Sequence, residues 1–586
     1  MRGERMTSVR SLELPSDGSS VEVLATTEAI RLFSDRALEA GGGFYLDADN
    51  AAAVVALCNR LDGIPLALEL AAARTRMMTP AEIAARLDER FRLLTGGSRT
   101  AVERHQTLRQ AVDWSYDLLE PREREILNRL GVFAGGFTLD AAEAVVAGDG
   151  VEGFDVFDGV AQLVDKSLVV AEHERDGTRY RLLETIRQYA LERLDDTGET
   201  DTLRRRHAEW CVTFATRADV GLRGPDEVEW ITRLSRETDN VRAGVTWAAG
   251  IDDADLALRQ IGALSAWYLM YRALGYRLAV LADVALSTTD ALDHPRAARV
   301  LATRGIDHLH HDRLEAAERD AREGIRLMRE ERSEPAFEPW AALFHTLVVL
   351  GRMEAFEADG TGLLDAAVAI GDPFFEAAAN VLLAAWLFSL NRGDEGLPQG
   401  EHALEIARHL GNPSLQMAAC SQVSGALLGR DPDRARALLL EAVAIGRQTG
   451  NDFFVSLALV RLARIDEAAI DPVWARQFQD AIALAGDNGD RRTITLLLDI
   501  LSESLATIGR TEPAAVLVGY MHEHAQHIAN PFSLATSERV AEMLTEALGD
   551  ERLGELLRHG AAMEFADAVA LSRAELDRVI DGAEET

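Results

Sequence analysis

The sequence of 586 residues contains a single lysine, Lys166, and its surroundings decide whether the chain can carry a phosphate-binding loop. Such a loop needs glycines whose backbone N–H groups reach phosphate oxygens, a lysine for the terminal phosphates, and a Ser or Thr hydroxyl for magnesium. Lys166 lies in LVDKSLVV, with no glycine loop before it, and no hydrophobic strand ending in paired acids is recognisable. The sequence therefore predicts that no Walker A motif is present and that this chain does not hydrolyse ATP.

Two histidine clusters have spacings that could place metal ligands on one side of a helix. Zinc sites usually add a third or fourth ligand, often cysteine or glutamate, and the HExxH spacing fails at Gln526. We therefore interpret the clusters as solvated histidines and predict no metal site. The histidines are His308, His310 and His311 in DHLHHD, and His522, His524 and His527 in MHEHAQH.

A third candidate is the turn between two helical patterns near Gly63. Apolar residues recur at helical spacing from Asn50 to Asp62, and Gly63 comes where that helix would stop. Pro65 suits the first position of the next helix, because its missing N–H would have no partner there. On spacing alone this is a helix, a turn and a helix. The buried positions expected on the two faces are Val54, Leu57, Cys58, Leu61, Leu66, Leu70 and Ala73.

The surrounding segments give this turn a wider context, since they resemble STAND-type bacterial regulators, related to the NB-ARC and LuxR/AfsR/MalT-like groups. The resemblance covers about Gly3 to Asp219, and the order of its segments is specific. The segments are CNRLDGIPLALELAAAR at 58–74, LDERFRLLTGGSRT at 87–100, RHQTLRQAVDWSYDLL at 104–119, LGVFAGGFTLDAAEAV at 130–145 and YRLLETIRQYALERL at 180–194.

In that family a P-loop ATPase core, a small helical domain and a winged helix close around ADP or ATP. The proline of a Gly-Leu-Pro turn there approaches the nucleotide base. The resemblance thus implies a base contact by Pro65, together with Gly63 and Ile64.

Two departures from the family's pattern argue against direct nucleotide sensing by this chain alone. The segment MRGERMTSVRSLELP resembles the stretch just after the last strands of the ATPase core, so Met1 is expected just downstream of that core. ATP or ADP is therefore expected as a cofactor only together with such a core. Many relatives also carry a Met-His-Asp motif whose histidine senses the β-phosphate. Leu182, Leu183 and Glu184 stand there instead, and a leucine cannot donate a hydrogen bond to phosphate.

The segment after residue 103 predicts a winged helix with one β-hairpin. An Asp-Gly pair at the end of His173–Gly177 supplies the hairpin turn. LEPREREILNRL at 119–130 resembles the start of a LuxR-type helix-turn-helix, but LGVFAGGFTLDAAEAV comes next in place of a basic recognition helix. The expected elements are helices near 106–118, 121–131, 138–147 and 154–165, and strands 167–172 and 178–183.

Charge argues against a nucleic-acid partner. The net charge is −35, and Asp117 to Glu199 alone contains 19 acidic and 9 basic residues. Affinity for DNA comes largely from cations that neutralise phosphates. We therefore expect this winged helix to pack on protein, and direct nucleic-acid binding is not expected.

Composition limits the classes of protein to which the chain can belong. At 47% hydrophobic residues the chain can bury several cores, and its length suggests three or four domains. No run of about 18 uncharged apolar residues occurs and the start lacks an apolar signal segment, which predicts a cytoplasmic protein without a membrane partner. Cys58, Cys211 and Cys420 lie far apart in apolar contexts, as reduced buried thiols do.

The second half contains a repeat of 39 residues. Ala403, Ala442 and Ala481 recur at this period, and a glycine comes eight residues after each. Such a period predicts stacked helical hairpins like tetratricopeptide repeats (TPRs), with helices longer than those of the standard 34-residue unit. The glycines are Gly411, Gly450 and Gly489, and Gly371 precedes Gly411 by 40.

Aromatic residues in the repeats are candidates for a groove on the solenoid. Paired phenylalanines come after the glycine in two units, and helical spacing favours core packing for at least one of each pair. The other could line a concave surface, where a protein or small-molecule effector is the expected partner. The candidates are Phe374, Phe375, Phe453 and Phe454, with Trp340, Trp386 and Tyr268 as weaker ones.

These observations predict a mainly α protein, with a helical lid and a winged helix followed by a TPR-like α-solenoid. We expect a regulator, part of a STAND-type ATPase transcriptional regulator, whose solenoid senses an effector; the resemblance also implies nucleotide-driven self-assembly into a homo-oligomer. The alternatives are a stand-alone TPR adaptor or a DNA-binding protein. The expected domains are a core remnant (1–23), the lid (24–103), the winged helix (104–200), a helical linker (201–250), the repeats (251–545) and a C-terminal cap (546–586).

Overall fold

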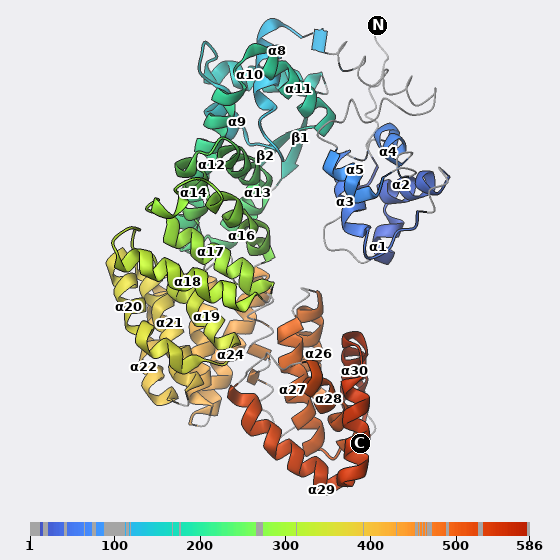
Figure 1. Ribbon diagram of the computed structural model, residues 1–586, viewed down its shortest axis with the longest axis vertical. Helices are drawn as coiled ribbons and strands as arrows, with labels where there is room; N and C mark the ends of the chain where they lie inside the picture. Colours follow the sequence, from blue (N-terminus) through green and yellow to red (C-terminus); the bar gives the residue numbers. More distant parts are fainter. Residues whose placement is uncertain are drawn as a thin grey trace. The chain divides into compact units, whose positions relative to one another are not determined.

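The computed structural model describes residues 12–582 except 16–20, 40–43, 62, 64, 73–74, 76–77, 87–111, 113–115, 118, 167, 175–176, 265–272, 312, 391, 429, 452–454, 456–457, 460, 463–464, 466–471, 488–490 and 525–530. The chain forms two compact units, Met1–Trp210 and Cys211–Thr586. Helices dominate both, and one two-stranded sheet is found among the described residues (Figure 1). The predicted fold class, mainly α with a winged helix and a helical solenoid, is confirmed.

The first unit begins with a small helical module around one apolar core. Val54, Leu57, Cys58 and Leu61 are all buried in it, as their spacing predicts. Asn50 is the N-cap of the third helix, so the helical pattern expected from residue 50 is confirmed. The helices are α1 (Val21–Thr26), α2 (Glu28–Glu39), α3 (Ala51–Arg60), α4 (Pro65–Ala72) and α5 (Pro80–Arg86).

A winged helix comes next in the same unit. Its apolar core gathers side chains from every one of the elements named below and also from the next helix, through Leu203 and Trp210. Thr138 caps the second helix by accepting a hydrogen bond from the backbone N–H of Ala141 at 3.2 Å. Most of the helix expected near 106–118 lies outside the described residues. The elements are α8 (Pro121–Leu130), α9 (Leu139–Val146), α10 (Gly153–Asp165), β1 (Val169–Glu174), β2 (Gly177–Leu182) and α11 (Glu184–Thr197).

The wing is an antiparallel hairpin whose register runs from Val169 opposite Leu182 to Glu174 opposite Gly177. The turn predicted at 173–177 was too long, because residues 173, 174 and 177 pair within the strands. The side chains of His173 and Thr178 also contact each other at 3.0 Å. Both predicted strands exist, shifted by one or two residues at their ends.

The second unit consists of helical hairpins stacked along the chain. Neighbouring helices of α17–α19 and of α21–α24 pack directly on one another (Figure 1). A long helix, α12, begins in the first unit and ends in the second. The helices are α12 (Thr200–Leu222), α13 (Glu227–Gly250), α14 (Ala254–Gly262), α16 (Ala273–Leu286), α17 (Ala297–His310), α18 (Leu314–Arg329), α19 (Glu338–Val349), α20 (Glu357–Ile370), α21 (Pro373–Ser389), α22 (Gly393–Leu410), α23 (Pro413–Leu427), α24 (Pro432–Thr449), α26 (Pro472–Asp487), α27 (Arg491–Thr507), α28 (Thr511–His524), α29 (Pro531–Ala561) and α30 (Phe565–Gly582).

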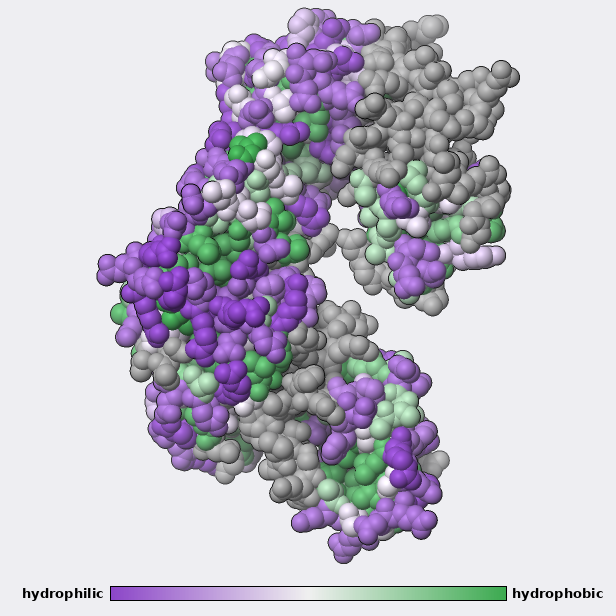
Figure 2. All heavy atoms as spheres, viewed as in Figure 1, coloured by the Kyte–Doolittle hydropathy of each residue, from purple (hydrophilic) through white to green (hydrophobic). Residues whose placement is uncertain are grey.

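Helix α18 is an example of a repeat helix with one buried apolar side and one exposed polar side. Ala317, Ala321 and Ile325 are buried on one side, at the three- and four-residue spacing of a helix packed on its neighbours. The other side is hydrophilic, and Figure 2 shows a continuous hydrophilic surface over this helix. Its exposed residues are Glu315, Arg319, Arg322, Arg326 and Arg329.

The predicted repeat coincides with helix ends. Gly371, Gly411 and Gly450 each end a helix in the left-handed conformation, with φ between 64° and 71°. Glycine adopts this conformation without a Cβ penalty, and a proline two residues after the first two glycines starts the next helix. The 39-residue period is therefore one helical hairpin, as predicted; Gly489 lies outside the described residues.

The repeat alanines lie at close helix contacts. Ala403, Ala442 and Ala481 are at most 1% exposed. A small side chain at one position of each hairpin lets the helices approach, and this explains the recurrence. Among the described residues, no helix combines the length and apolar character needed to cross a membrane.

Candidate functional site

The turn at Gly63 has a backbone that only glycine fits. Its φ is +61°, and a Cβ built there would lie 2.5 Å from the carbonyl oxygen of Leu12. The N–H of Gly63 donates to the carbonyl of Cys58 at 3.2 Å, and its own carbonyl accepts from the N–H of Leu12 at 3.0 Å. Gly63 thus closes the end of α3 and holds the segment that precedes α1.

Pro65 begins α4, as its position after the turn predicts, and its side chain is exposed. An exposed proline beside a rigid glycine turn can present a flat apolar edge to a ligand. Ile64 lies outside the described residues, as do Ala73 and the side chains of Leu66 and Leu70. The base contact itself stays a prediction.

The residues that align with the Met-His-Asp motif of STAND-type regulators make contacts within the winged helix. Leu182 ends β2 and is buried in the winged-helix core, while Leu183 is the N-cap of α11. Glu184 pairs with Arg187 at 2.8 Å and accepts a hydrogen bond from Gln188 at 3.0 Å. The side chains at these three positions supply no hydrogen-bond donor for a phosphate.

A buried arginine, Arg129, organises the polar side of the winged helix. Its side chain is 1% exposed and pairs with Glu125 at 2.9 Å and with Glu199 at 2.8 Å. It also donates to the carbonyls of Val146 and Gly148 at 3.0 and 2.8 Å. The guanidinium therefore ties α8 to the end of α9 and to the start of α12.

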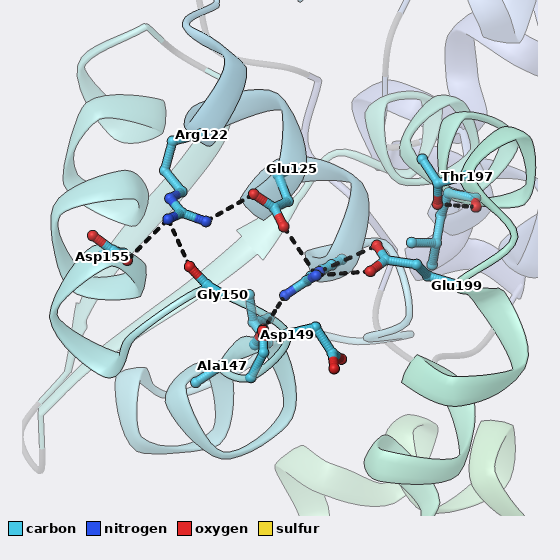
Figure 3. Close-up of polar contacts among 12 residues, drawn as sticks. Arg122, Glu125, Ala147, Asp149, Gly150, Asp155, Thr197 and Glu199 are labelled. Atoms are coloured by element: carbon cyan, nitrogen blue, oxygen red, sulfur yellow. Dashed lines mark hydrogen bonds and ion pairs between the residues drawn. The ribbon is translucent and has the colours of Figure 1, made fainter.

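A more exposed arginine, Arg122, makes a similar set of contacts from the start of α8 (Figure 3). It contacts Glu125 at 2.9 Å, the carbonyl of Gly150 at 2.6 Å and Asp155 at 3.5 Å. Both arginines are thus engaged in contacts within the domain.

Helix α10 precedes the wing, in the place where a winged helix reads DNA, yet its chemistry is unsuited to that role. Gly153–Asp165 contains three aspartates and no arginine or lysine. Lys166, next to the helix end, donates to Glu123 at 2.6 Å. The exposed face instead carries Phe154 and Phe157, which are 73% and 48% exposed. We did not expect these two rings from the sequence, although a spacing of three residues places them side by side on a helix.

A polar contact in the second unit joins the tip of the α12–α13 hairpin to the N-terminal ends of α21 and α23; we call it the tip contact. The Asn412 side chain donates to the carbonyls of Leu222 and Gly224 at 2.8 and 3.2 Å. The backbone N–H of Ser414 donates to the Glu227 carboxylate at 2.9 Å, and its hydroxyl bonds to the same carboxylate.

Arg223 completes the tip contact on its other side. It pairs with Asp372, the N-cap of α21, and its guanidinium lies 5.4 Å from the ring centre of Phe375. All residues of the tip contact are partly or fully buried. No sequence pattern signals this contact, because Asn412 and Asp372 look like ordinary caps of their own helices.

The aromatic candidates divide between core and partly exposed positions. Phe374 and Phe375 are both at most 1% exposed, so both belong to the core and neither lines a groove. Trp340 is buried and Trp386 is half-buried. The candidates outside the described residues are Phe453, Phe454 and Tyr268.

An open hollow lies along α22, in the part of the second unit that the structure describes. It is open to solvent and lined by both polar and apolar residues, and none of the aromatic candidates lines it. Its lining residues are Pro398, Glu401, His402, Leu404, Glu405 and Arg408.

The cysteines are structural. Burial raises the pKa of the Cys58 and Cys420 thiols to about 12, and it also raises the pKa of Cys211. None of the three is therefore a reactive thiolate at neutral pH.

The histidine clusters do not form a metal site in the described ranges, where no three His, Cys, Asp or Glu residues are placed to hold an ion. Burial lowers the pKa of His308, despite its ion pair with Asp320 at 3.5 Å. His524 contacts the carbonyl of Ala561 at 3.2 Å. His527 lies outside the described residues.

Comparison with known proteins places the winged helix in a family. Residues 119–195 match the family described as "Winged helix-turn-helix domain". A protein of Mycobacterium tuberculosis named "Putative HTH-type transcriptional regulator" is 49% identical over 223 residues, which cover 38% of this chain and 25% of that protein. A second M. tuberculosis protein, described as uncharacterised, is 50% identical over 183 residues, covering 31% of this chain and 47% of the relative.

The chain thus spans about a quarter to a half of the length of the curated relatives it matches. Two solved structures also align. A Signal Transduction ATPase with Numerous Domains (STAND) protein with a tetratricopeptide repeat sensor, from Pyrococcus horikoshii, gives a TM-score of 0.46 at 16% identity, covering 88% of this chain and 74% of that one. A Rap protein complexed with Competence and Sporulation Factor gives a TM-score of 0.39 at 15% identity, covering 64% of this chain and 99% of that one.

The segments that predicted the resemblance at 130–145 and 180–194 fall within the matched winged helix, and the relative at 49% identity carries a regulator's name. The predicted resemblance to regulators of this kind is therefore confirmed, and residues 119–195 match the winged helix-turn-helix domain family.

Proposed function

We propose that this chain is the regulatory part of a STAND-type ATPase transcriptional regulator, in which the helical repeats bind an effector and the winged helix contacts protein. The observation that carries the proposal is the union of a winged helix with an array of helical hairpins in one chain, joined through the continuous helix α12. Helical repeats present extended surfaces, and such surfaces suit a protein or small-molecule effector.

The proposal assigns no catalysis to these residues and a cytoplasmic location to the chain. Three buried cysteines without a disulfide between them support an intracellular protein. ATP or ADP would bind only when an ATPase core is present, and this chain would then contact the nucleotide through Gly63, Ile64 and Pro65. The purified chain should therefore release no phosphate from ATP. Tight binding and hydrolysis of ATP by the chain alone would contradict the proposal.

Pro65→Ala tests the nucleotide part separately. The side chain is exposed at the start of α4, so the variant should keep its fold. Weaker ATP or ADP affinity at an unchanged melting temperature would support the base contact. Equal nucleotide affinity of the wild type and the Pro65 variant would rule out the base contact. A reading frame upstream of Met1 that encodes Gly-Lys-Ser or Gly-Lys-Thr after a glycine-rich loop would supply such a core.

DNA binding through the winged helix is the second candidate, favoured by the names of the relatives. Binding carried by phosphate contacts must weaken steeply as salt rises. If the chain bound duplex DNA with micromolar or tighter affinity that falls with salt, the winged helix would be assigned to DNA and not to a protein partner. The acidic α10 leads us to expect none.

A further inference from the structure

The outward face of α10 combines two aromatic rings with carboxylates. Phe154 and Phe157 are 73% and 48% exposed, and their ring centres lie 6.5 Å apart in a stacked arrangement. Single exposed apolar side chains are common on proteins, whereas contiguous apolar patches rimmed by polar residues mark interaction sites. The opposite face of the same helix is buried in the winged-helix core. The exposed residues that share the outward face are Asp158, Ala161, Gln162 and Asp165.

The charged residues of α10 are acidic, and the two cations next to the helix, Arg122 and Lys166, are already paired. Asp158 and Asp165 are exposed, and α10 itself contains no arginine or lysine. Arg122 faces Asp155, but it also holds Glu125 and the carbonyl of Gly150. The surface therefore presents apolar rings within negative potential. A second copy of the same face would oppose carboxylate to carboxylate, and duplex DNA would meet the same repulsion.

We propose that the outward face of α10 is a docking surface for a basic amphipathic helix of a partner protein. This inference rests on the proposed protein contact by the winged helix and names its surface. Apolar side chains of the partner cover Phe154 and Phe157, while its arginines or lysines pair with Asp158 and Asp165. Aromatic anchors surrounded by complementary charge are the usual centre of such an interface.

The full chain can be tested with a synthetic probe. The probe is a fluorescent peptide with leucines and arginines at helical spacing; its comparators are a scrambled peptide of the same composition and a version with glutamate for arginine. Anisotropy should show binding of the basic amphipathic peptide that weakens with salt, and little binding of the other two. The double variant Phe154→Ser/Phe157→Ser should lose about tenfold or more in affinity.

Gln162→Ala is the matched control, because it changes an exposed side chain on the same face without removing a ring or a charge. It should bind as the wild type does. The serine variants should also keep the wild-type circular dichroism and melting temperature, since both rings are exposed. A double variant that unfolds would place the rings in a core and overturn the inference.

Other outcomes separate this inference from the proposed function. Equal binding of the three peptides, or peptide binding unchanged in the double variant, overturns the α10 surface alone. Concentration-dependent dimerisation lost in the double variant would assign the rings to a second copy and also overturn it. Tight, salt-dependent DNA binding by the wild type would overturn protein contact by the winged helix and the α10 surface together.

Discussion

The carboxylate of Glu227 accepts a hydrogen bond from the backbone N–H of Ser414 at 2.9 Å, although the two residues are 187 positions apart. Ser414 is the second residue of α23, where a backbone N–H has no partner within its own helix. A negative charge there is favourable because the N-terminus of a helix is its positive end. Arrays of helical repeats mostly make contacts between neighbours, so this bond fixes the first hairpin of the unit to a distant one.

Glu227→Ala should therefore lower the stability of the second unit. The carboxylate is 1% exposed, and its loss removes the acceptor of the N–H of Ser414. Losing a charged partner of a buried donor costs about 3 kcal/mol, which corresponds to several degrees in melting temperature. Differential scanning calorimetry of the full chain measures the shift.

Glu229→Ala is the control for this change. Its side chain is 49% exposed and pairs with Arg233 along the same helix, a type of ion pair worth less than about 1 kcal/mol. Equal melting temperatures for the wild type and the Glu227 variant would show that the tip contact does not stabilise the unit.

Arg129→Met should destabilise the winged helix far more than Arg122→Met. Methionine keeps much of the volume of Arg129 but removes the buried donor to the carbonyls of Val146 and Gly148. Removing one partner from such a buried network costs about 3–5 kcal/mol. Arg122 is 44% exposed, so the same change there should cost about 1 kcal/mol or less. Urea unfolding followed by circular dichroism would distinguish them, and comparable losses would argue against a special role for Arg129.

The helix boundaries of the repeats could be predicted because the responsible chemistry is local. A glycine that ends a helix and a proline that starts the next are visible at Gly371–Pro373 and Gly411–Pro413. The predicted strands of the wing ended one or two residues too far from the turn, since the pairing of Glu174 with Gly177 depends on a partner strand and not on composition.

The functional surfaces were harder to predict. Gly63 was identified at its turn, and the structure adds a reason that the sequence lacks, the close approach of Leu12. The tip contact joins Asn412 to Leu222, which no local pattern relates. Phe154 sits in an apolar helix start, and only the fold shows which of its neighbours face the core.

His345 should make the stability of the second unit depend on pH. Its Nδ1 contacts the carbonyl of Ala341 at 2.7 Å, and burial lowers its pKa to about 4, from an ordinary value near 6.5. As pH falls below about 6.5, the unfolded chain takes up this proton before the folded chain does. Stability is thus present above pH 6.5 and falls towards pH 4.

The test for His345 is a comparison with His345→Gln, which cannot titrate. Between pH 7 and 4.5 the variant should lose less melting temperature than the wild type, because the carboxylates titrate equally in both. Identical pH profiles would show that His345 takes up its proton equally in the folded and unfolded chains.

Cys420 offers a probe of the tip contact, because it is fully buried in α23, the helix that Ser414 helps to begin. With a pKa of about 12, its thiol should react with Ellman's reagent at pH 8 only when α23 opens locally. Glu227→Ala should raise the opening population and speed this reaction by about tenfold or more, since about 1.4 kcal/mol gives a factor of ten. Cys58 lies in the first unit and should keep its rate in the same variant, which separates local opening from general unfolding. Variants with a single cysteine allow each rate to be followed alone, and acceleration of both thiols to the same extent would contradict a local role for Glu227.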